Sequence, residues 1–328
     1  MLLLSITLSV VFTFALLYST LELPIMLNRF LMEMFPDYGV GWEAAEEFVN
    51  YVRPLSYACL GFTLTLMIMG FVLKRGKMTF LGSATLYLPT FSYFASTMFF
   101  LAGIGILRIL WLPLIDLAPG SSIYEKIYVA GNFLELGDVV YLPYDAIRFT
   151  FMVFERASTF HNGLDNIFFQ AFVIAGSVLF FVSCATWFYA KFKALPFADF
   201  FIYKYSRHPQ YLSFLIWSYG LLVYDKYVFY PPRGGYFAPP PLLWLVSALT
   251  LTGVALHEEW TMLKNYGESY AEYRFKTPFM LPLSKPVEKL LTAPVRLIFK
   301  KSYPEKNYEI VVILTMYGLV LLTASVLY

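Results

Sequence analysis

Long apolar segments separated by shorter polar ones dominate this chain, and their lengths predict membrane-spanning helices. A helix needs about 20 apolar residues to cross the hydrocarbon core of a bilayer. Five segments are long enough to do so, namely residues 3–23, 55–73, 84–107, 167–189 and 308–328. The first has no basic region before it and no clear small-residue cleavage site. We therefore expect an uncleaved span there rather than a secretory signal.

Two shorter apolar segments follow one another at residues 210–224 and 241–257. The sequence between them, YPPRGGYFAPPP, is rich in proline and glycine, which cannot continue a helix and force a turn. The two segments are thus predicted to form a helical hairpin. With the five longer segments, the fold class is an all-α integral membrane protein with about seven transmembrane helices.

Composition and charge agree with this class. Hydrophobic residues make up 59% of the chain and charged residues only 14%, a balance beyond that of soluble proteins. The net charge of +2, without a clustered basic patch, argues against a nucleic-acid partner. Cys59 and Cys184 lie in apolar segments without a partner at metal-ligand spacing. Neither a metal site nor a disulfide framework is predicted.

The distribution of Lys and Arg predicts the orientation, because short cytosolic loops carry an excess of these residues. The loops after 55–73 and 167–189 are basic, through Lys74, Arg75, Lys77, Lys191 and Lys193. The loops 24–54 and 108–166 lean acidic and are expected outside. Alternation then places residues 207–208 and 258–307 on the cytosolic side.

Two segments have a mixed pattern. Residues 120–160 are partly apolar but interrupted by charged residues such as Asp145 and Arg148, which predicts an interfacial amphipathic segment. A buried polar span lining a cavity is the alternative. Residues 285–301 alternate apolar and basic side chains, as in a segment that lies on anionic lipid. A role in substrate gating is the alternative for this segment.

The segment YSRHPQY, which precedes the hairpin, carries candidate chemistry. Pro209 suits the first position of a helix, so the helix is predicted to begin there. A helix N-terminus beside Arg207 favours an anion, and His208 can donate or accept a proton near neutral pH. The alternative is an interfacial anchor with a snorkelling arginine.

The second half of the hairpin ends in paired acids, Glu258 and Glu259. Acids near a helix C-terminus oppose the helix dipole, so we expect a partner for them, either a ligand ammonium or Arg207. Gly267 is predicted to stop or kink the helix, with a short turn after it. Tyrosines at helical spacing (Tyr266, Tyr270 and Tyr273) accompany this turn; as an alternative they are membrane-interface aromatics.

These motifs carry a resemblance. Arg207-His208-Pro209-x-Tyr211, the hairpin, Glu258-Glu259, Tyr266-Gly267-x-x-Tyr270-x-x-Tyr273 and Thr277-Pro278 occur in that order. Residues 167–282 thereby resemble the isoprenylcysteine carboxyl methyltransferase and phospholipid methyltransferase superfamily of integral membrane enzymes. The resemblance implies a C-terminal methyltransferase-like helical bundle that encloses S-adenosylmethionine at its cytosolic end. It also implies a lipophilic methyl acceptor, such as an isoprenylcysteine carboxylate or a phospholipid headgroup, that enters from the bilayer.

The resemblance also implies roles for individual residues. The residues expected to contact the cofactor are Arg207, His208, Tyr211, Glu258, Glu259 and Tyr270. Either Glu258 or Glu259 would take the ammonium of the cofactor. Glu268 and Arg274 are the candidate catalytic residues that orient the acceptor, because a guanidinium can hold a carboxylate or phosphate through two hydrogen bonds.

The chain is accordingly divided into three predicted regions. Residues 1–160 form an N-terminal membrane region of unassigned role, 161–284 the methyltransferase-like core, and 285–328 an amphipathic segment with the last span. Two other functions fit parts of the sequence. A sterol-reductase-like NADPH oxidoreductase shares the His-Pro-x-Tyr element and the Lys264 to Gly267 element, and in a non-catalytic lipid-binding protein the cytosolic charges would only anchor the chain. The sequence does not indicate an oligomeric state.

Overall fold

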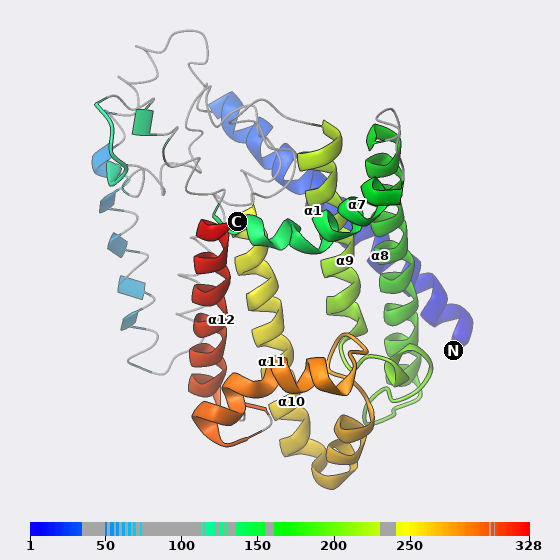
Figure 1. Cartoon of the computed structure of the whole chain (residues 1–328). Coiled ribbons are helices and arrows are strands. Elements are labelled where there is room, and N and C mark those ends of the chain that lie inside the picture. The colour runs from blue at the N-terminus through cyan, green and yellow to red at the C-terminus, as the bar shows by residue number, and fades with distance from the viewer. Residues whose placement is uncertain are drawn as a thin grey trace. The chain divides into compact units, whose positions relative to one another are not determined.

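All regular elements in the described part of the chain are helices (Figure 1). The computed structural model describes residues 1–34, scattered positions between 50 and 129, residues 136–154, 161–229, and 241–328 without 302 and 305. The chain divides into two compact units. The first contains Met1–Leu17, Gly137–Val228 and Trp244–Tyr328, the second Tyr18–Leu136 and Phe229–Leu243. The candidate site lies in the first unit.

Three of the described helices contain stretches long and apolar enough to cross a membrane. They are α1 (Leu2–Met34), α8 (His161–Phe192) and α12 (Asn307–Leu327). These helices coincide with predicted spans, and they indicate a membrane protein. The predicted span 84–107 and much of 55–73 lie outside the described residues.

Both helices of the predicted hairpin are present. Helix α9 (Pro209–Val223) begins at Pro209, as predicted, and continues into a π-helix at Tyr224–Phe229. Helix α10 (Pro241–Lys276) begins after the predicted turn, which lies outside the described residues. The predicted kink at Gly267 is confirmed, with φ 54° and ψ −128°. The predicted short turn after it is wrong, because residues 268–276 are helical and α10 resumes beyond the kink.

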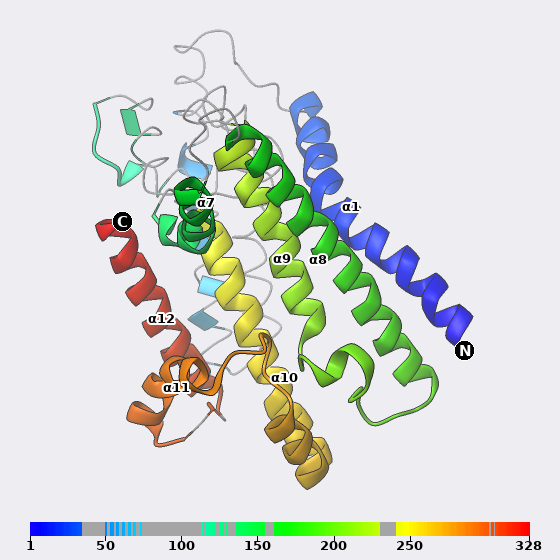
Figure 2. The same cartoon turned by 45° about the vertical axis from the view of Figure 1, so that its right-hand side comes forward.

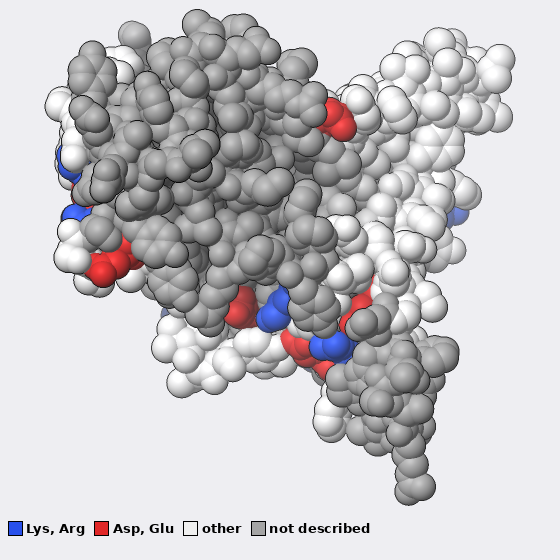
Figure 3. Space-filling view, turned by 90° about the horizontal axis from the view of Figure 1, so that it is seen from above, with Lys and Arg blue, Asp and Glu red and all other residues white. Residues whose placement is uncertain are grey.

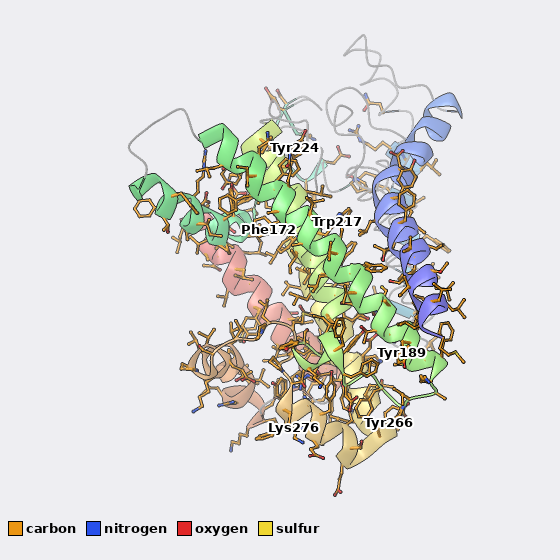
Figure 4. The ribbon with its side chains drawn as sticks, turned by 90° about the vertical axis from the view of Figure 1, so that its right-hand side faces the viewer. Phe172, Tyr189, Trp217, Tyr224, Tyr266 and Lys276 are labelled. Carbon is orange, nitrogen blue, oxygen red and sulfur yellow. The ribbon has the colours of Figure 1, made fainter. Side chains whose placement is uncertain are left out.

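Helices α8 and α9 pack closely through two glycines. A Cβ atom on Gly176 would lie 2.5 Å from the backbone nitrogen of Trp217, and one on Gly220 would lie 3.0 Å from the backbone nitrogen of Val173. Small residues at a helix interface allow such close approach of the backbones. Figure 4 shows Phe172 and Trp217 in the middle of this pair, with Tyr224 toward one end of it and Tyr266 and Lys276, which belong to α10, beyond the other end.

The segment 120–160 contains a 3-10 helix at Asp138–Tyr141 and helix α7 (Leu142–Phe154). A helix of 13 residues spans about 20 Å, short of the roughly 30 Å of a hydrocarbon core. Its axis lies across those of α8 and α10 (Figure 2). This geometry favours the interfacial alternative over a spanning one.

Helix α11 (Lys285–Phe299) precedes α12 and contacts it. Much of the surface of the first unit is apolar, with exposed leucine, valine and phenylalanine side chains along α1, α8 and α12. Figure 3 shows few acidic or basic side chains among the described residues on the face it presents.

Candidate functional site

The site forms where the start of α9 meets the C-terminal part of α10. His208 caps α9, directly before Pro209 at the first helical position. The backbone N–H of Arg207 donates to the carbonyl of Pro278, with an N–O distance of 3.0 Å. The chain that leaves α10 therefore runs beside the segment that enters α9, and it brings two separate sequence motifs together.

Glu259 lies at the centre of a buried charged group. Arg207 Nε is 2.7 Å from Glu259 Oε1, Arg274 Nε is 2.9 Å from Oε2, and His208 Nε2 is 3.3 Å from Oε1. The side chains of Arg207 and Glu259 are 0% and 1% exposed. We call Arg207, His208, Glu259 and Arg274 the Glu259 cluster. Of the two partners expected for the paired acids, Arg207 is the one that Glu259 contacts, and Arg274 is a second cation beside it.

The arginines of the Glu259 cluster are ion-paired by distance but poorly aligned for hydrogen bonding. Arg207 Nη1 donates to the carbonyl of Arg274 at 2.5 Å. Arg207 Nη2, the Nε atoms of both arginines and Glu259 Oε2 are buried without an aligned hydrogen-bond partner among the described residues. Two guanidinium groups thus face one buried carboxylate. Within the cluster two positive charges thus face one negative charge, which favours a further anionic group beside the arginines.

The neighbouring Glu258 points in a different direction, because successive residues of a helix are about 100° apart around its axis. Its side chain is 50% exposed. The Tyr211 hydroxyl donates to Glu258 Oε1 at 2.6 Å, and His208 Nδ1 lies 3.8 Å from Oε2. The His208 ring stacks on that of Tyr211, with centroids 5.8 Å apart. Of the two predicted acids, Glu258 is therefore the one accessible to a cationic ligand.

The tyrosine stripe packs against Phe197, whose ring lies 5.6, 5.3 and 5.4 Å from those of Tyr266, Tyr270 and Tyr273. Tyr270 is only 3% exposed. Burial raises the pKa of its phenol, and the negative charge of Glu259 raises it further. The Tyr273 hydroxyl donates to the carbonyl of Tyr203 at 2.7 Å. Tyr270 and Tyr273 thus pack inward and join the site to the segment before α9, whereas Tyr266 is 37% exposed.

Two aromatic residues that the sequence did not indicate complete the site. The Tyr303 ring lies 4.3 Å from Arg274 Cζ and 5.4 Å from Arg207 Cζ. The Phe279 ring lies 5.8 Å from Arg207 Cζ and 5.1 Å from the His208 ring. Such contacts stabilise buried cations. Phe279 follows the Thr277-Pro278 motif directly, whereas Tyr303 comes from the segment between α11 and α12, where no motif marks it.

The predicted site residues are therefore mostly gathered in one place. Arg207, His208, Tyr211, Glu258, Glu259, Tyr270 and Arg274 lie in or beside the Glu259 cluster. Glu268 is exposed just beyond the kink, and no hydrogen bond or ion pair joins it to another described residue. Arg274, predicted to act with Glu268 on the acceptor, contacts the residues predicted for the cofactor instead.

Comparisons with protein-family models, with curated proteins and with solved structures find no match for this chain. Within the described residues no three His, Cys, Asp or Glu side chains are grouped so that they could hold a metal ion.

Proposed function

We propose that this protein is an integral membrane methyltransferase that uses S-adenosylmethionine and acts on a lipophilic acceptor at the cytosolic face. The acceptor class is an isoprenylcysteine carboxylate, a phospholipid headgroup or a similar group. One observation carries the proposal. Residues from three separate motifs converge on one site, namely His208 and Tyr211 of α9, Glu258 and Glu259 of α10, and Arg274 beyond the kink.

The residues present fit the charges of this cofactor. Glu258 offers a half-exposed carboxylate to the cofactor's ammonium, and the Tyr211 hydroxyl holds that carboxylate in place. The rings of His208, Tyr211 and Phe279 lie beside it and can face a sulfonium. Glu259 is enclosed by two arginines, so its role in the proposal is to position Arg207, Arg274 and His208.

When bound, S-adenosylmethionine supplies a methyl group on a positively charged sulfur, which keeps the carbon–sulfur electron pair when an acceptor takes the methyl. The protein then needs mainly to align the acceptor and exclude water. Arg207 and Arg274 would hold an anionic acceptor, because both guanidinium groups lie at the Glu259 cluster and a guanidinium can bind a carboxylate or phosphate through two hydrogen bonds. A carboxylate acceptor needs no base. For an amine acceptor His208 can accept the released proton.

The proposal includes about seven spans and a C-terminal helical bundle with its site facing the cytosol. The bias of Lys and Arg toward the same side as the Glu259 cluster supports this orientation. A membrane-embedded bundle would also give a lipophilic acceptor direct access from the bilayer.

The test is calorimetric binding of S-adenosylmethionine to the detergent-purified protein. Glu258→Gln should weaken binding by about tenfold, since a charge-assisted contact to the ligand ammonium is lost. His208→Ala should weaken it as well. Glu272→Gln is the matched control, because Glu272 lies on the same helix but is exposed and paired with Lys276; it should bind like the wild type.

Two outcomes would overturn the proposed activity, and a third would overturn the proposed site. Binding of NADPH in place of S-adenosylmethionine would favour the reductase-like function. Binding of neither cofactor would favour a non-catalytic lipid-binding protein. Equal losses in Glu258→Gln and Glu272→Gln would place the cofactor elsewhere in the chain.

A further inference from the structure

Helix α11 presents an apolar face that the first unit leaves uncovered. Five apolar side chains on it are 42–81% exposed, namely Val287, Leu290, Leu291, Leu297 and Ile298. Their spacings of three, four and seven residues place them on one side of the helix. Among the α11 side chains that the structure describes, only Val295 is buried. The helix therefore packs on the protein along a narrow strip and exposes the wider apolar side.

The opposite side of α11 is predominantly basic. Lys289, Arg296 and Lys300 are exposed there, with Glu288 as the acid on this side. An amphipathic helix with cations on its polar face binds a membrane whose surface is anionic. The positive charge of α11 therefore favours one binding partner for the uncovered apolar face, namely a bilayer that contains anionic phospholipid.

The position of α11 puts it at the level where such a surface lies. It ends at Phe299, and the candidate span α12 begins at Asn307. The Tyr317 hydroxyl of α12 donates to the carbonyl of Leu291, and Lys301 Nζ lies 3.4 Å from Glu309 Oε1. The axis of α11 crosses that of α12 near the start of α12 (Figures 1 and 2). If α12 spans a bilayer, a helix in this place would run along its surface.

Tyr303 connects α11 to the Glu259 cluster. Its hydroxyl donates to Glu288 Oε1 of α11 at 3.0 Å, while its ring lies over Arg274 and Arg207. Burial raises the pKa of Tyr303, so the phenol stays protonated and able to donate at neutral pH. A displacement of α11 would therefore be transmitted to the ring that covers both arginines.

We infer that α11 docks on an anionic lipid surface and that, through Glu288 and Tyr303, this docking holds the Tyr303 ring over Arg207 and Arg274. The lipid surface is then a regulatory partner of the Glu259 cluster. The inference concerns the site of the proposed function, but it does not depend on methyl transfer, so its tests read out lipid contact and local protection rather than activity.

The first test measures the depth of α11 by spin labelling in lipid nanodiscs. Labels are placed at Ile298→Cys and Lys289→Cys in a Cys59→Ala, Cys184→Ala background. The two positions are about two and a half turns apart and so lie on opposite sides of the helix. In nanodiscs of phosphatidylcholine with phosphatidylglycerol, the label at 298 should be accessible to oxygen and the label at 289 to a water-soluble nickel chelate. In phosphatidylcholine alone, the difference between the two positions in their access to oxygen and to the nickel chelate should fall several-fold.

Two results would overturn the docking. Access of the nickel chelate to position 298 in both lipids would mean that α11 is in water. Shielding of position 298 from both reagents would mean that protein, such as a second copy of this chain, covers the face.

The second test measures the coupling by hydrogen–deuterium exchange of residues 272–282. Phosphatidylglycerol should slow exchange in the wild type several-fold. Tyr303→Leu should abolish this effect, and Tyr303→Phe, which keeps the ring but loses the bond to Glu288, should reduce it. Tyr205→Leu is the control, because the Tyr205 ring is 67% exposed; it should respond like the wild type. Lipid protection that persists in both Tyr303 variants, or is absent in the wild type, would refute the coupling.

Discussion

Two buried carboxylates lie at opposite ends of α9, and the protein surrounds them differently. Glu259 and Asp165 are both 1% exposed. Glu259 faces Arg207, Arg274 and His208 near the start of α9. Asp165 accepts a hydrogen bond from the Tyr144 hydroxyl at 2.6 Å and lies 3.2 Å from Arg148 Nη2. The first acid is held by several charges, the second by a neutral donor and one charge.

The acids of the second region are held mainly by tyrosine hydroxyls. Asp145 accepts hydrogen bonds from the hydroxyls of Tyr227 and Tyr328, and the Arg148 guanidinium lies 4.9 Å from the Tyr227 ring. Glu259 instead faces charged donors, namely two arginines and His208. The comparison teaches that neutral hydrogen bonds hold the helices together in one region, whereas the other gathers two positive charges, as binding of an anionic group requires.

The largest difference between the two regions is expected when each buried acid is replaced by its amide in turn. Glu259→Gln leaves the buried Arg207 guanidinium and the partly exposed Arg274 guanidinium without a carboxylate between them, and loss of one partner from a buried ion pair costs about 3–5 kcal/mol. Asp165→Asn keeps an oxygen that accepts from Tyr144, so we expect a loss of about 1–3 kcal/mol. Thermal unfolding in detergent measures both.

Glu258→Gln provides the control for this pair, because the Glu258 side chain is half exposed. It should unfold close to the wild-type temperature. If Asp165→Asn were as destabilising as Glu259→Gln, the proposed difference between the two regions would be wrong.

The next test concerns the helix pair that connects the two regions. Gly176→Ala would force a Cβ to within 3 Å of the Trp217 backbone, and overpacking of this kind costs about 1–3 kcal/mol. Gly253→Ala is the control, since its Cβ would meet the flexible end of Leu314 instead. The unfolding temperature should fall in the first variant and change little in the second. An equal response would show that the close approach of α8 and α9 is unimportant.

An effect of similar size, but confined to one region, is expected at the kink. Gly267 has φ 54° and ψ −128°, a combination that residues with a Cβ rarely adopt and that costs them about 1–3 kcal/mol. Gly267→Ala should destabilise the protein by about this amount and increase hydrogen exchange around Arg274 but not around Asp165. Gly163→Ala, at a helical glycine with equally open space around its Cβ, should leave exchange unchanged. Faster hydrogen exchange around both Arg274 and Asp165 in Gly267→Ala would refute the local role of the kink.

The smallest expected effect is a pH dependence of the free energy of unfolding, caused by Tyr270 beside the Glu259 cluster. Burial and the Glu259 charge raise the pKa of Tyr270 above its ordinary value near 10. The stability that the protonated phenol contributes is complete below the ordinary pKa and is lost as the pH rises toward the folded pKa. Tyr270→Phe should therefore reduce the loss of stability between neutral and alkaline pH. The test is to measure the unfolding temperatures of the wild type and of Tyr270→Phe across that pH range. An identical dependence on pH in the two proteins would contradict the prediction.

Several features followed from the sequence because their causes are local. Pro209 fixes the start of α9, since a proline is favourable only where no helical hydrogen bond is needed. Gly267 permits the kink because glycine, which has no Cβ, adopts positive φ at little steric cost. The apolar stretches within α1, α8 and α12 are long enough to mark them as candidate spans. That Arg207 and the paired acids share one site was expected because acids near a helix C-terminus need a partner, and because the resemblance implies a common site.

Other features depended on tertiary structure, because they are set by distant residues. Glu258 and Glu259 are adjacent and chemically alike, and only the packing of α10 against the start of α9 decides that Glu259 is enclosed and Glu258 exposed. The continuation of α10 brings Arg274 to Glu259, where the sequence predicted a turn. Tyr303 reaches both arginines from beyond α11. Backbone preferences and apolar periodicity act over a few residues, so the sequence determined the helices and their breaks. The packing of those helices decides which side chains come into contact with a buried charged residue such as Glu259.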